Sequence, residues 1–375
     1  MQVFDNPSPW FTALAFLAVL GPLVFLHELG HYLVGRWCGI RADTFSIGFG
    51  REVLGWTDKR GTRWKVGWLP LGGYVQFAGD DDAMSTPHEV TSREPEGSFA
   101  AAALWKRSLT VLAGPVANFI VAIIILTGFA MIYGKPTTLP VAAVVEAGSP
   151  AAEAGIVPGD RIISVDGRAM ETFTDIPMAV AHNTGTPISV VIDRDGARRT
   201  LTFAPAIVTE KDGFGNDVKR AVMGIGRPAA SFAPVPLLET PVVATQLAWG
   251  IVRQMGEVIG QLLVGQRSIK DLGGPLMIAK ASGEQASLGW APFLSFVAVI
   301  SLNLGFVNLL PLPMLDGGHL LFNAIEAVRR RPVSVNTQQW AFRAGFAALA
   351  TLMIVVTFND LGAFGLWDRL AGLIG

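Results

Sequence analysis

The sequence is short of charged residues. Only 16% of its 375 residues are Asp, Glu, Lys or Arg, whereas a soluble domain usually carries about 25%. Hydrophobic residues make up 51% of the chain, so the composition indicates a membrane protein with a soluble part. The formal net charge of −1 gives no sign of a nucleic-acid partner.

Cysteine is almost missing as well. The single cysteine, Cys38, excludes an intrachain disulfide and a zinc site built from several cysteines. The first ten residues contain no Lys or Arg, so the positively charged region of a secretory signal peptide is lacking. We therefore expect the apolar run that follows to be retained and to enter the membrane from the non-cytoplasmic side.

Long apolar runs are present, and a bilayer span needs roughly 20 mostly apolar residues. Four candidate spans cover residues 10–32, 108–133, 290–310 and, as the shortest, 344–358. Lys and Arg are frequent in the loops after the first and third spans, and such loops are expected in the cytoplasm. Both termini and the long segment 135–288 are then predicted on the opposite side.

The predicted fold class is a mainly α-helical polytopic membrane protein with four transmembrane helices, a cytoplasmic-side β-hairpin and an inserted α+β domain. Two membrane parts, each with two spans, flank the inserted domain and an amphipathic connecting region. The predicted bounds are 1–134 for the first membrane part, 135–228 for the inserted domain, 229–288 for the connecting region and 289–375 for the second membrane part.

Residues 41–77 have the pattern of a β-hairpin. Apolar residues alternate at Trp64, Val66 and Trp68, and a turn signal stands at 58–61. Two interpretations remain open, a ribbon on the solvent side or a hairpin that dips toward the first span and offers a free edge to extended substrate. Edge backbone at membrane depth is tolerated only where protein or a watery cavity surrounds it.

Residues 140–206 alternate strand and helix patterns, and ISVVIDRDG at 188–196 with ARRTLTF at 197–203 is predicted to form a β-hairpin. Three strings closely resemble a PDZ domain in their order, namely SPAAEAG at 149–155, PGDRII at 158–163 and VDG at 165–167. The resemblance implies a groove that binds peptide by adding it as a strand to a sheet edge, and a structural spacer is the alternative. Met223, Gly224 and Ile225 stand where a circularly permuted PDZ domain would place its carboxylate-binding loop.

The segment 246–271 has apolar residues at helical spacing. That spacing predicts an amphipathic helix on a membrane surface, and packing against the inserted domain explains it equally well.

Two histidines and a glutamate lie in the string HELGH, at 27–31, near the end of the first span. Ionisable side chains at membrane depth are costly and call for a functional explanation. His27 and His31 are at i and i+4, so a helix projects both imidazoles from one face toward one ion. Zn²⁺ suits such ligands, and Glu28 stands where a general base takes a proton from activated water. The alternative is a histidine pair satisfied by hydrogen bonds inside the bundle.

A catalytic zinc takes three protein ligands, so a third ligand is expected at membrane depth. Asp316 is the best candidate, because it is the only carboxylate in 285–325. It follows a span that Pro311 and Pro313 break. Capping of the next helix by Asp316 is the alternative, and His319 is a competing ligand or a partner of a ligand.

HELGH at 27–31, NxxPxPxLDG at 308–317 and the inserted PDZ-like domain together resemble the site-2 protease family of intramembrane zinc metalloproteases, most closely the bacterial regulator-of-sigma-E type. The resemblance covers nearly the whole chain. It implies that the two histidines and Asp316 bind zinc and that Glu28 activates water. One departure is that the best-studied enterobacterial form has two PDZ domains in tandem, whereas one unit is evident here.

The resemblance also implies a set of substrate-binding residues. The family asparagine that holds substrate backbone extended stands at 308, and the family's membrane-reentrant hairpin is similar to 61–77. The second-span motif is similar to GPVAN at 114–118, whose asparagine either contacts substrate or pairs inside the bundle. The broken helix and the hairpin edge would offer hydrogen bonds to an unwound substrate. The residues expected to bind substrate are Asn308, Asn118, Pro311, Pro313, Gly73 and Tyr74.

The activity implied is regulated proteolysis of single-span membrane proteins within the bacterial inner membrane, as in stress responses. Anti-sigma factors and remnant signal peptides, already cut by another protease, are the implied substrates. The PDZ-like domain and both termini are expected in the periplasm, on a monomer that binds the bilayer and no nucleic acid. Two other classes remain open: a membrane-anchored PDZ adaptor with a structural metal site, and a metal transporter.

Overall fold

The computed structural model describes residues 7–79, 96–173, 175–180, 185–211, 217–226, 231–265 and 273–363. The chain divides into two compact units. Residues 1–126 and 244–375 form the first, called the membrane unit below, and residues 127–243 form the second, called the inserted unit. The finer domain bounds given above stay predictions.

Four helices of the described chain are long and apolar enough to cross a membrane, as the sequence predicted. They are α1 (Pro9–Trp37), α2 (Leu104–Ile132), α7 (Trp290–Asn308) and α9 (Val335–Ala363). Helix α9 begins well before the predicted span 344–358. The sequence did not indicate its first turns because Gln338, Gln339 and Arg343 lower their hydropathy. The other helices of the membrane unit are α5 (Thr240–Leu263), α6 (Pro275–Ser287) and α8 (Asp316–Arg329).

Helices α1, α2 and α7 share the interior of the membrane unit. Val19 and Leu23 of α1 are at most 1% exposed and pack with Val297 and Ile300 of α7. A second cluster joins α2, α5 and α7 through the buried residues Ala122, Ala248, Ala298 and Leu302. Small residues such as these alanines allow the close approach of neighbouring helices.

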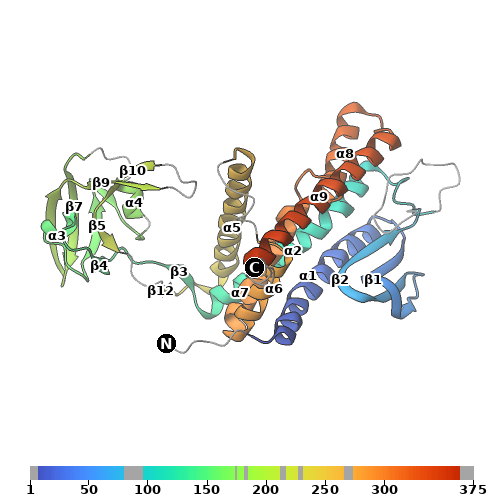
Figure 1. Cartoon of the computed structure of the whole chain (residues 1–375), viewed down its shortest axis with the longest axis horizontal. Coiled ribbons are helices and arrows are strands. Elements are labelled where there is room, and N and C mark those ends of the chain that lie inside the picture. The colour runs from blue at the N-terminus through green and yellow to red at the C-terminus, as the bar shows by residue number, and fades with distance from the viewer. Residues whose placement is uncertain are drawn as a thin grey trace, which may run out of the picture. The chain divides into compact units, whose positions relative to one another are not determined.

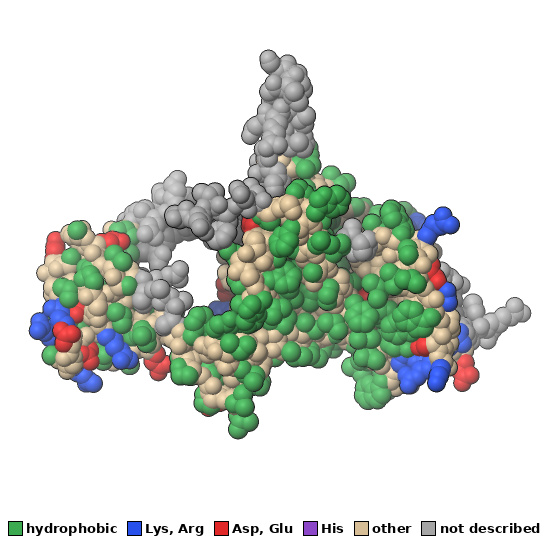
Figure 2. All heavy atoms as spheres, turned by 90° about the horizontal axis from the view of Figure 1, so that it is seen from below, with side chains coloured by type: hydrophobic (Ala, Val, Ile, Leu, Met, Phe, Trp, Pro, Cys, Tyr) green, Lys and Arg blue, Asp and Glu red, His purple; other side chains and the backbone are tan. Residues whose placement is uncertain are grey.

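The exterior of the membrane unit is largely apolar. Figure 2 shows hydrophobic side chains over much of its visible face, whereas Lys and Arg gather at the end that carries the hairpin. Phe346, Ile354 and Phe358 of α9 are among the exposed apolar side chains. An exposed apolar surface of this kind suits contact with the hydrocarbon of a bilayer.

Helix α5 accounts for the described part of the segment 246–271, where a helix was predicted. Ile251, Val252 and Met255 pack into the cluster with α2 and α7, a contact that the sequence did not predict. Trp249, another apolar residue of this segment, is 68% exposed. The spacing predicts an apolar face and cannot identify what that face covers. Residues 266–271 lie outside the described chain.

The predicted hairpin is present, with strands β1 (Ala42–Thr57) and β2 (Arg63–Phe77) paired antiparallel. Asp58 holds its turn by accepting from the backbone N–H groups of Arg60 and Thr62, at 2.8 and 3.0 Å. The same carboxylate accepts from Tyr32 of α1 and Trp64 of β2, at 3.3 and 3.1 Å. Asp58 therefore ties the hairpin to α1, and the two lie side by side in Figure 1.

A carboxylate from α9 caps the start of α6. The N-cap residue of α6, Gly274, supplies no side-chain hydrogen bond. Asp360 is 2% exposed and accepts from the backbone N–H groups of Gly274, Leu276 and Met277, at 3.0, 3.1 and 3.1 Å. The first N–H groups of a helix lack partners within it, so Asp360 acts as an N-cap supplied by another helix.

The inserted unit contains a four-stranded antiparallel sheet in the order β6-β5-β7-β8. Its strands are β5 (Arg161–Val165), β6 (Arg168–Ala169), β7 (Ile188–Arg194) and β8 (Ala197–Phe203). The hairpin β7–β8 is the one predicted from ISVVIDRDG and ARRTLTF. The short helices are α3 (Pro150–Glu153), α4 (Asp175–Val180) and the 3-10 helix Leu237–Glu239.

Three two-stranded pairs accompany this sheet in the described part of the inserted unit. One of them begins at residue 206, where the predicted strand pattern ends. The partners are β3 (Lys135–Thr137) with β12 (Ser231–Ala233), β4 (Val144–Val145) with β11 (Ile225–Gly226), and β9 (Ala206–Lys211) with β10 (Asp217–Val222).

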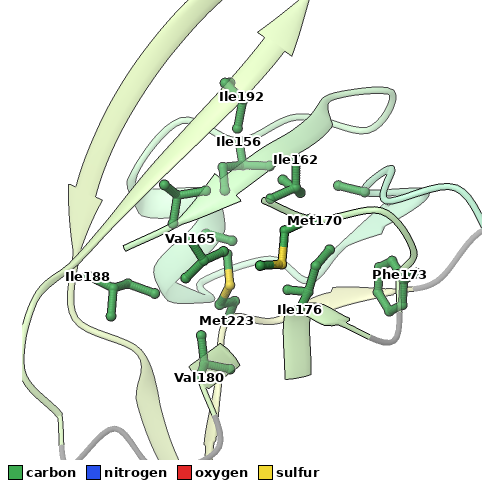
Figure 3. Packing of buried hydrophobic residues seen from close by; sticks show 13 residues of the cluster. Ile156, Ile162, Val165, Met170, Phe173, Ile176, Val180, Ile188, Ile192 and Met223 are labelled. Atoms are coloured by element: carbon green, nitrogen blue, oxygen red, sulfur yellow. The ribbon is translucent and has the colours of Figure 1, made fainter. Parts of the chain in front are cut away.

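Strands β5 and β7 and helix α4 enclose one apolar core (Figure 3). Ile162 of β5, Ile188 and Ile192 of β7 and Ile176 of α4 are at most 2% exposed. Burial along the start of β7 alternates with period two, as expected for a strand with one face on a core.

An ion pair between the buried Asp160 and Arg194, the last residue of β7, lies in the inserted unit. The Asp160 side chain is 0% exposed and accepts two hydrogen bonds of 2.7 Å from Arg194. The backbone N–H of Val157 donates to the same carboxylate at 2.8 Å. Burial by itself raises the pKa of Asp160, but these hydrogen bonds hold that pKa below its usual range.

We expect Asp160→Ala to destabilise the inserted unit at pH 7 by about 2 kcal/mol, since it leaves buried donors without a partner. Because the pKa of Asp160 is lower in the folded than in the unfolded chain, its stabilisation is complete above about pH 4 and is lost as the pH falls through the folded pKa. Hydrogen exchange of β5 and β7 amides in the full chain measures both effects. Asp195→Asn, at an exposed turn, is the control, and equal protection in Asp160→Ala and wild type at pH 7 contradicts the prediction.

Candidate metal centre

Helix α1 presents two buried imidazoles one turn apart. His27 and His31 are 8% and 9% exposed, and their Nε2 atoms lie 3.2 Å apart. The i, i+4 spacing on a continuous helix produces this convergence, as the sequence predicted.

Asp316 reaches the same point from the turn between α7 and α8. Its Oδ2 lies 3.2 Å from His27 Nε2, and its Oδ1 lies 3.4 Å from His31 Nε2. The N-cap residue of α8 is Leu315, so Asp316 is the first helical residue and the capping alternative is not what the structure shows. Met314 has a φ of 83°, a left-handed conformation that is uncommon for a non-glycine residue and occurs here beside the site.

The three side chains fit a metal ion. One ligand atom from each of His27, His31 and Asp316 lies within 4.8 Å of the other two. Oδ2 of Asp316 is buried and makes no hydrogen bond, although His27 is close to it. A buried carboxylate oxygen without a hydrogen bond is costly unless a cation binds it. Two imidazoles and one carboxylate are the ligand types that zinc takes in catalytic sites.

Helix α2 contacts the other ring nitrogen of each histidine. Nδ1 of His31 lies 2.9 Å from the backbone carbonyl of Thr110, which only accepts, so Nδ1 carries the proton and Nε2 has the lone pair. The side-chain nitrogen of Asn118 lies 3.2 Å from Nδ1 of His27. Partners of this kind fix the orientation of imidazole ligands.

Gly114, between these two positions of α2, leaves room for His31. A Cβ at this position would overlap with the imidazole of His31. We expect Gly114→Ala to weaken zinc binding by at least about tenfold, because the ring must leave its place. Alanine favours a helix by about 1 kcal/mol over glycine, so loss of helix propensity cannot explain such a result.

A chelator competition assay on the purified full chain measures this effect. Gly128→Ala is the matched control, since a Cβ at Gly128 of the same helix has no atom within 4 Å. Equal zinc affinity in Gly114→Ala and wild type would show that Gly114 does not set the position of His31.

The three side chains border a cavity of about 430 Å³. Glu28 and Asn308 line it, together with Gly73 and Tyr74 of strand β2. Gly73 is close to Glu28, since a Cβ there would lie 3.3 Å from the Glu28 Cγ. The general-base candidate, the ligand cluster and an edge of the hairpin thus border one cavity.

His319 lines the same cavity but stands outside the group of three. Its ring packs against Phe342 of α9 with centroids 4.9 Å apart. Burial lowers the pKa of His319, so the ring is neutral at pH 7. The geometry favours Asp316 as the third ligand, in line with the ranking from the sequence.

The remaining predicted site residues lie elsewhere. Pro311 and Pro313 are in the turn after α7 and are not among the residues that line the cavity. Met223 is 3% exposed in the apolar core of the inserted unit, so its side chain is not available to a groove. Gly224 accepts a backbone hydrogen bond from Glu146 at 2.9 Å, and Ile225 pairs with Val145.

Sequence reasoning missed Thr110 and Met314. Thr110 acts through its backbone carbonyl, which leaves no mark in the sequence. Met314 adopts a conformation that its residue type does not favour. Gly114 does have a signal, as the first residue of the GPVAN string.

A cluster of two imidazoles and a carboxylate, with a glutamate that lines the same cavity among apolar helices, indicates a membrane-embedded metallohydrolase. The model of Peptidase family M50 matches residues 15–352. The chain belongs to this family, the site-2 proteases, and is a zinc metalloprotease. With its four apolar helices it is a multi-pass membrane protein.

Relatives of similar length match throughout. A protein of Rhizobium meliloti, provisionally named a zinc metalloprotease, is 45% identical over 94% of this chain and 96% of its own. One from Agrobacterium fabrum with the same kind of name is 44% identical over 93% of this chain and 95% of its own. Metalloprotease MmpA of Caulobacter vibrioides is 36% identical over 95% of this chain and 97% of its own.

A solved structure gives a much weaker match. A PDZ domain from Listeria monocytogenes covers 25% of this chain and 87% of its own, at 16% identity and a TM-score of 0.18. A score this low supports no argument about the inserted unit, whose identity as a PDZ domain stays a prediction.

Proposed function

We propose that this zinc metalloprotease hydrolyses peptide bonds within or near the transmembrane segment of single-span membrane proteins. The observation that supports this most is the place of the ligand cluster. His27 and His31 are on a 29-residue apolar helix, and the cavity beside them is bordered by other helices of the bundle. A substrate segment that comes from the bilayer or from its edge would meet these residues.

We assign zinc binding to His27, His31 and Asp316. Zinc bound there would supply Lewis acidity, activating a water molecule and polarising the scissile carbonyl. Glu28 is the proton carrier: its carboxylate accepts a proton from the attacking water and then donates it to the leaving amine.

A transmembrane helix must unwind before its peptide bonds can be cut, because its backbone amides are already hydrogen-bonded. Asn308, the last residue of α7, lines the cavity and is assigned to hold the unwound backbone through its amide. Gly73 and Tyr74 are on β2, whose only strand partner in the described chain is β1. The part of β2 that contains Gly73 and Tyr74 and lines the cavity could therefore pair with an extended segment, as in other strand-addition complexes.

We assign the site to the cytoplasmic side of the bacterial inner membrane, and the inserted unit and both termini to the periplasm. The support is the bias of Lys and Arg toward the loops after the first and third spans. On this topology the inserted unit, as a PDZ domain, would bind an end left by an earlier cleavage or bar bulky ectodomains. Anti-sigma factors and remnant signal peptides fit as substrates of such a protein.

Cleavage of a model substrate tests this proposal. The full chain is purified in detergent, reconstituted in liposomes and given a tagged single-span protein, and mass spectrometry locates the cut. We expect a cut within or beside the apolar segment that stops when zinc is chelated and returns when zinc is restored. Cuts confined to soluble loops would contradict the intramembrane part of the proposal.

A membrane-anchored PDZ adaptor with a structural metal site is the alternative of a different class. Such a protein needs the metal for stability and has no use for a glutamate beside the ligands. It would bind the tagged substrate without cutting it, with or without zinc, so the same experiment separates the two functions.

A further inference from the structure

Asn118 of α2 has no part in the hydrolytic steps described above. Its side chain borders the cavity, yet the residue is 0% exposed, and it contacts the Nδ1 side of the His27 ring. Its backbone carbonyl accepts from the Ser301 hydroxyl of α7 at 2.8 Å, which fixes this turn of α2 in the bundle. A residue held so firmly behind a ligand is poorly placed to contact substrate.

Two arrangements satisfy the 3.2 Å distance between the Asn118 amide and Nδ1 of His27. In the first, the amide nitrogen donates to Nδ1, which puts the proton of the neutral ring on Nε2. In the second, the amide is rotated by 180° about Cβ–Cγ, and Oδ1 accepts a hydrogen bond from Nδ1–H. Only the second leaves a lone pair on Nε2, the atom that faces His31 and Asp316.

The position of Nε2 favours the second arrangement. With the nitrogen toward His27, Oδ1 of Asn118 is buried and has no hydrogen-bond partner. Rotation of the amide gives Oδ1 the Nδ1–H group of His27 and puts the amide nitrogen in the former place of the oxygen, so one side-chain atom lacks a partner in either form. The second form alone gives Nε2, which lies 3.2 Å from Asp316, the lone pair that a metal ligand needs.

The other histidine, His31, also has an oxygen acceptor beside its Nδ1 atom. The Thr110 carbonyl accepts from Nδ1 of His31 and leaves the lone pair on Nε2. Thr110 and Asn118 lie on one helix, two turns apart, and serve the two histidines of α1 in antiparallel order. A backbone carbonyl for one ring and a side-chain oxygen for the other would give both histidines the same tautomer.

On the basis of the metal site proposed above, we propose that Asn118 is a positioning residue for His27. Its Oδ1 accepts the Nδ1–H of the imidazole, holds the ring orientation and keeps Nε2 free to bind zinc. Asn118 therefore belongs to the support of the metal site and does not recognise substrate.

Zinc affinity of two variants tests this role. Asn118→Leu keeps the size of the side chain and removes both polar atoms, and we expect its zinc affinity to fall about 10- to 100-fold. Asn118→Asp keeps acceptors and removes the donor, and we expect affinity within about threefold of wild type, because carboxylate–histidine–zinc triads are common. Asn303→Leu of α7, a half-buried asparagine away from the cavity lining, is the matched control.

The variants have distinct outcomes. Unchanged affinity in Asn118→Leu overturns the proposal, and so does an equal loss in Asn118→Asp and Asn118→Leu, which would show that the amide donates. If Asp316→Ala abolishes zinc binding while Asn118→Leu does not affect it, the metal site stands and only the role of Asn118 fails. If Asp316→Ala binds zinc normally, the metal site itself is misassigned.

The tautomer of His27 gives a second test that needs no variant at Asn118. The full chain is labelled with ¹⁵N-histidine, freed of zinc, and studied by NMR, with His27→Gln used only to assign the signal. A proton on Nδ1 supports the proposal, and a proton on Nε2 overturns it. This measurement decides the question even if both Asn118 variants fail to fold.

Discussion

Glu28→Gln is expected to reduce the turnover number by about 10²- to 10⁴-fold, the usual contribution of general acid–base catalysis. The amide has nearly the size of the carboxylate but cannot accept and return a proton at neutral pH. Because Glu28 lines the cavity and is not one of the three ligand residues, zinc stoichiometry should stay at the wild-type value. Initial rates on a tagged single-span substrate, together with metal analysis of the same sample, give both quantities.

The matched control is Glu284→Gln, at a carboxylate of α6 that is 44% exposed and pairs with Lys280. Its turnover should equal that of wild type. If Glu28→Gln cleaves as fast as wild type, Glu28 is not the proton carrier and the proposed mechanism is wrong. If it loses zinc as well, the glutamate has a structural part in the metal site that the geometry does not show.

Asp316→Ala is expected to lower zinc affinity by more than the roughly 10- to 100-fold that loss of a ligand's partner costs, because it removes a ligand itself. Cleavage should fall below detection at wild-type zinc concentrations. The reason is the geometry of the cluster, in which both Asp316 oxygens lie within 3.4 Å of an imidazole nitrogen. Chelator competition and cleavage assays on the full chain measure the two effects.

Two further variants make this result specific. Asp43→Ala removes an exposed carboxylate that pairs with Arg41, and should leave zinc binding unchanged. His319→Ala removes the competing candidate, and should weaken zinc binding far less than Asp316→Ala does. Full zinc affinity in Asp316→Ala combined with its loss in His319→Ala would reverse the assignment of the third ligand.

The sequence was most informative where residue type conflicts with surroundings. HELGH in an apolar run carries a cost that a metal site explains, and the structure brings its two histidines together with Asp316, the carboxylate after the broken span. The hairpin strands and the hairpin β7–β8 followed from alternation and turn signals, because period two and a turn are local properties.

Long-range features could not be predicted in this way. The contact of Thr110 with His31 uses a backbone carbonyl that every residue type has. The cap that Asp360 gives to α6 joins helices far apart in the chain. The face covered by α5 depends on which helices lie beside it. The first turns of α9 contain polar residues, so hydropathy alone does not indicate that the helix begins there.

The division of the ligands between α1 and the start of α8 has a consequence for biosynthesis. The histidines leave the ribosome early, whereas Asp316 follows only after the whole inserted unit has been made. On the proposed zinc assignment, the ligand set is therefore incomplete in the nascent chain until Asp316 has been made. A truncated product that ends before Asp316 is then expected to lack zinc-dependent activity.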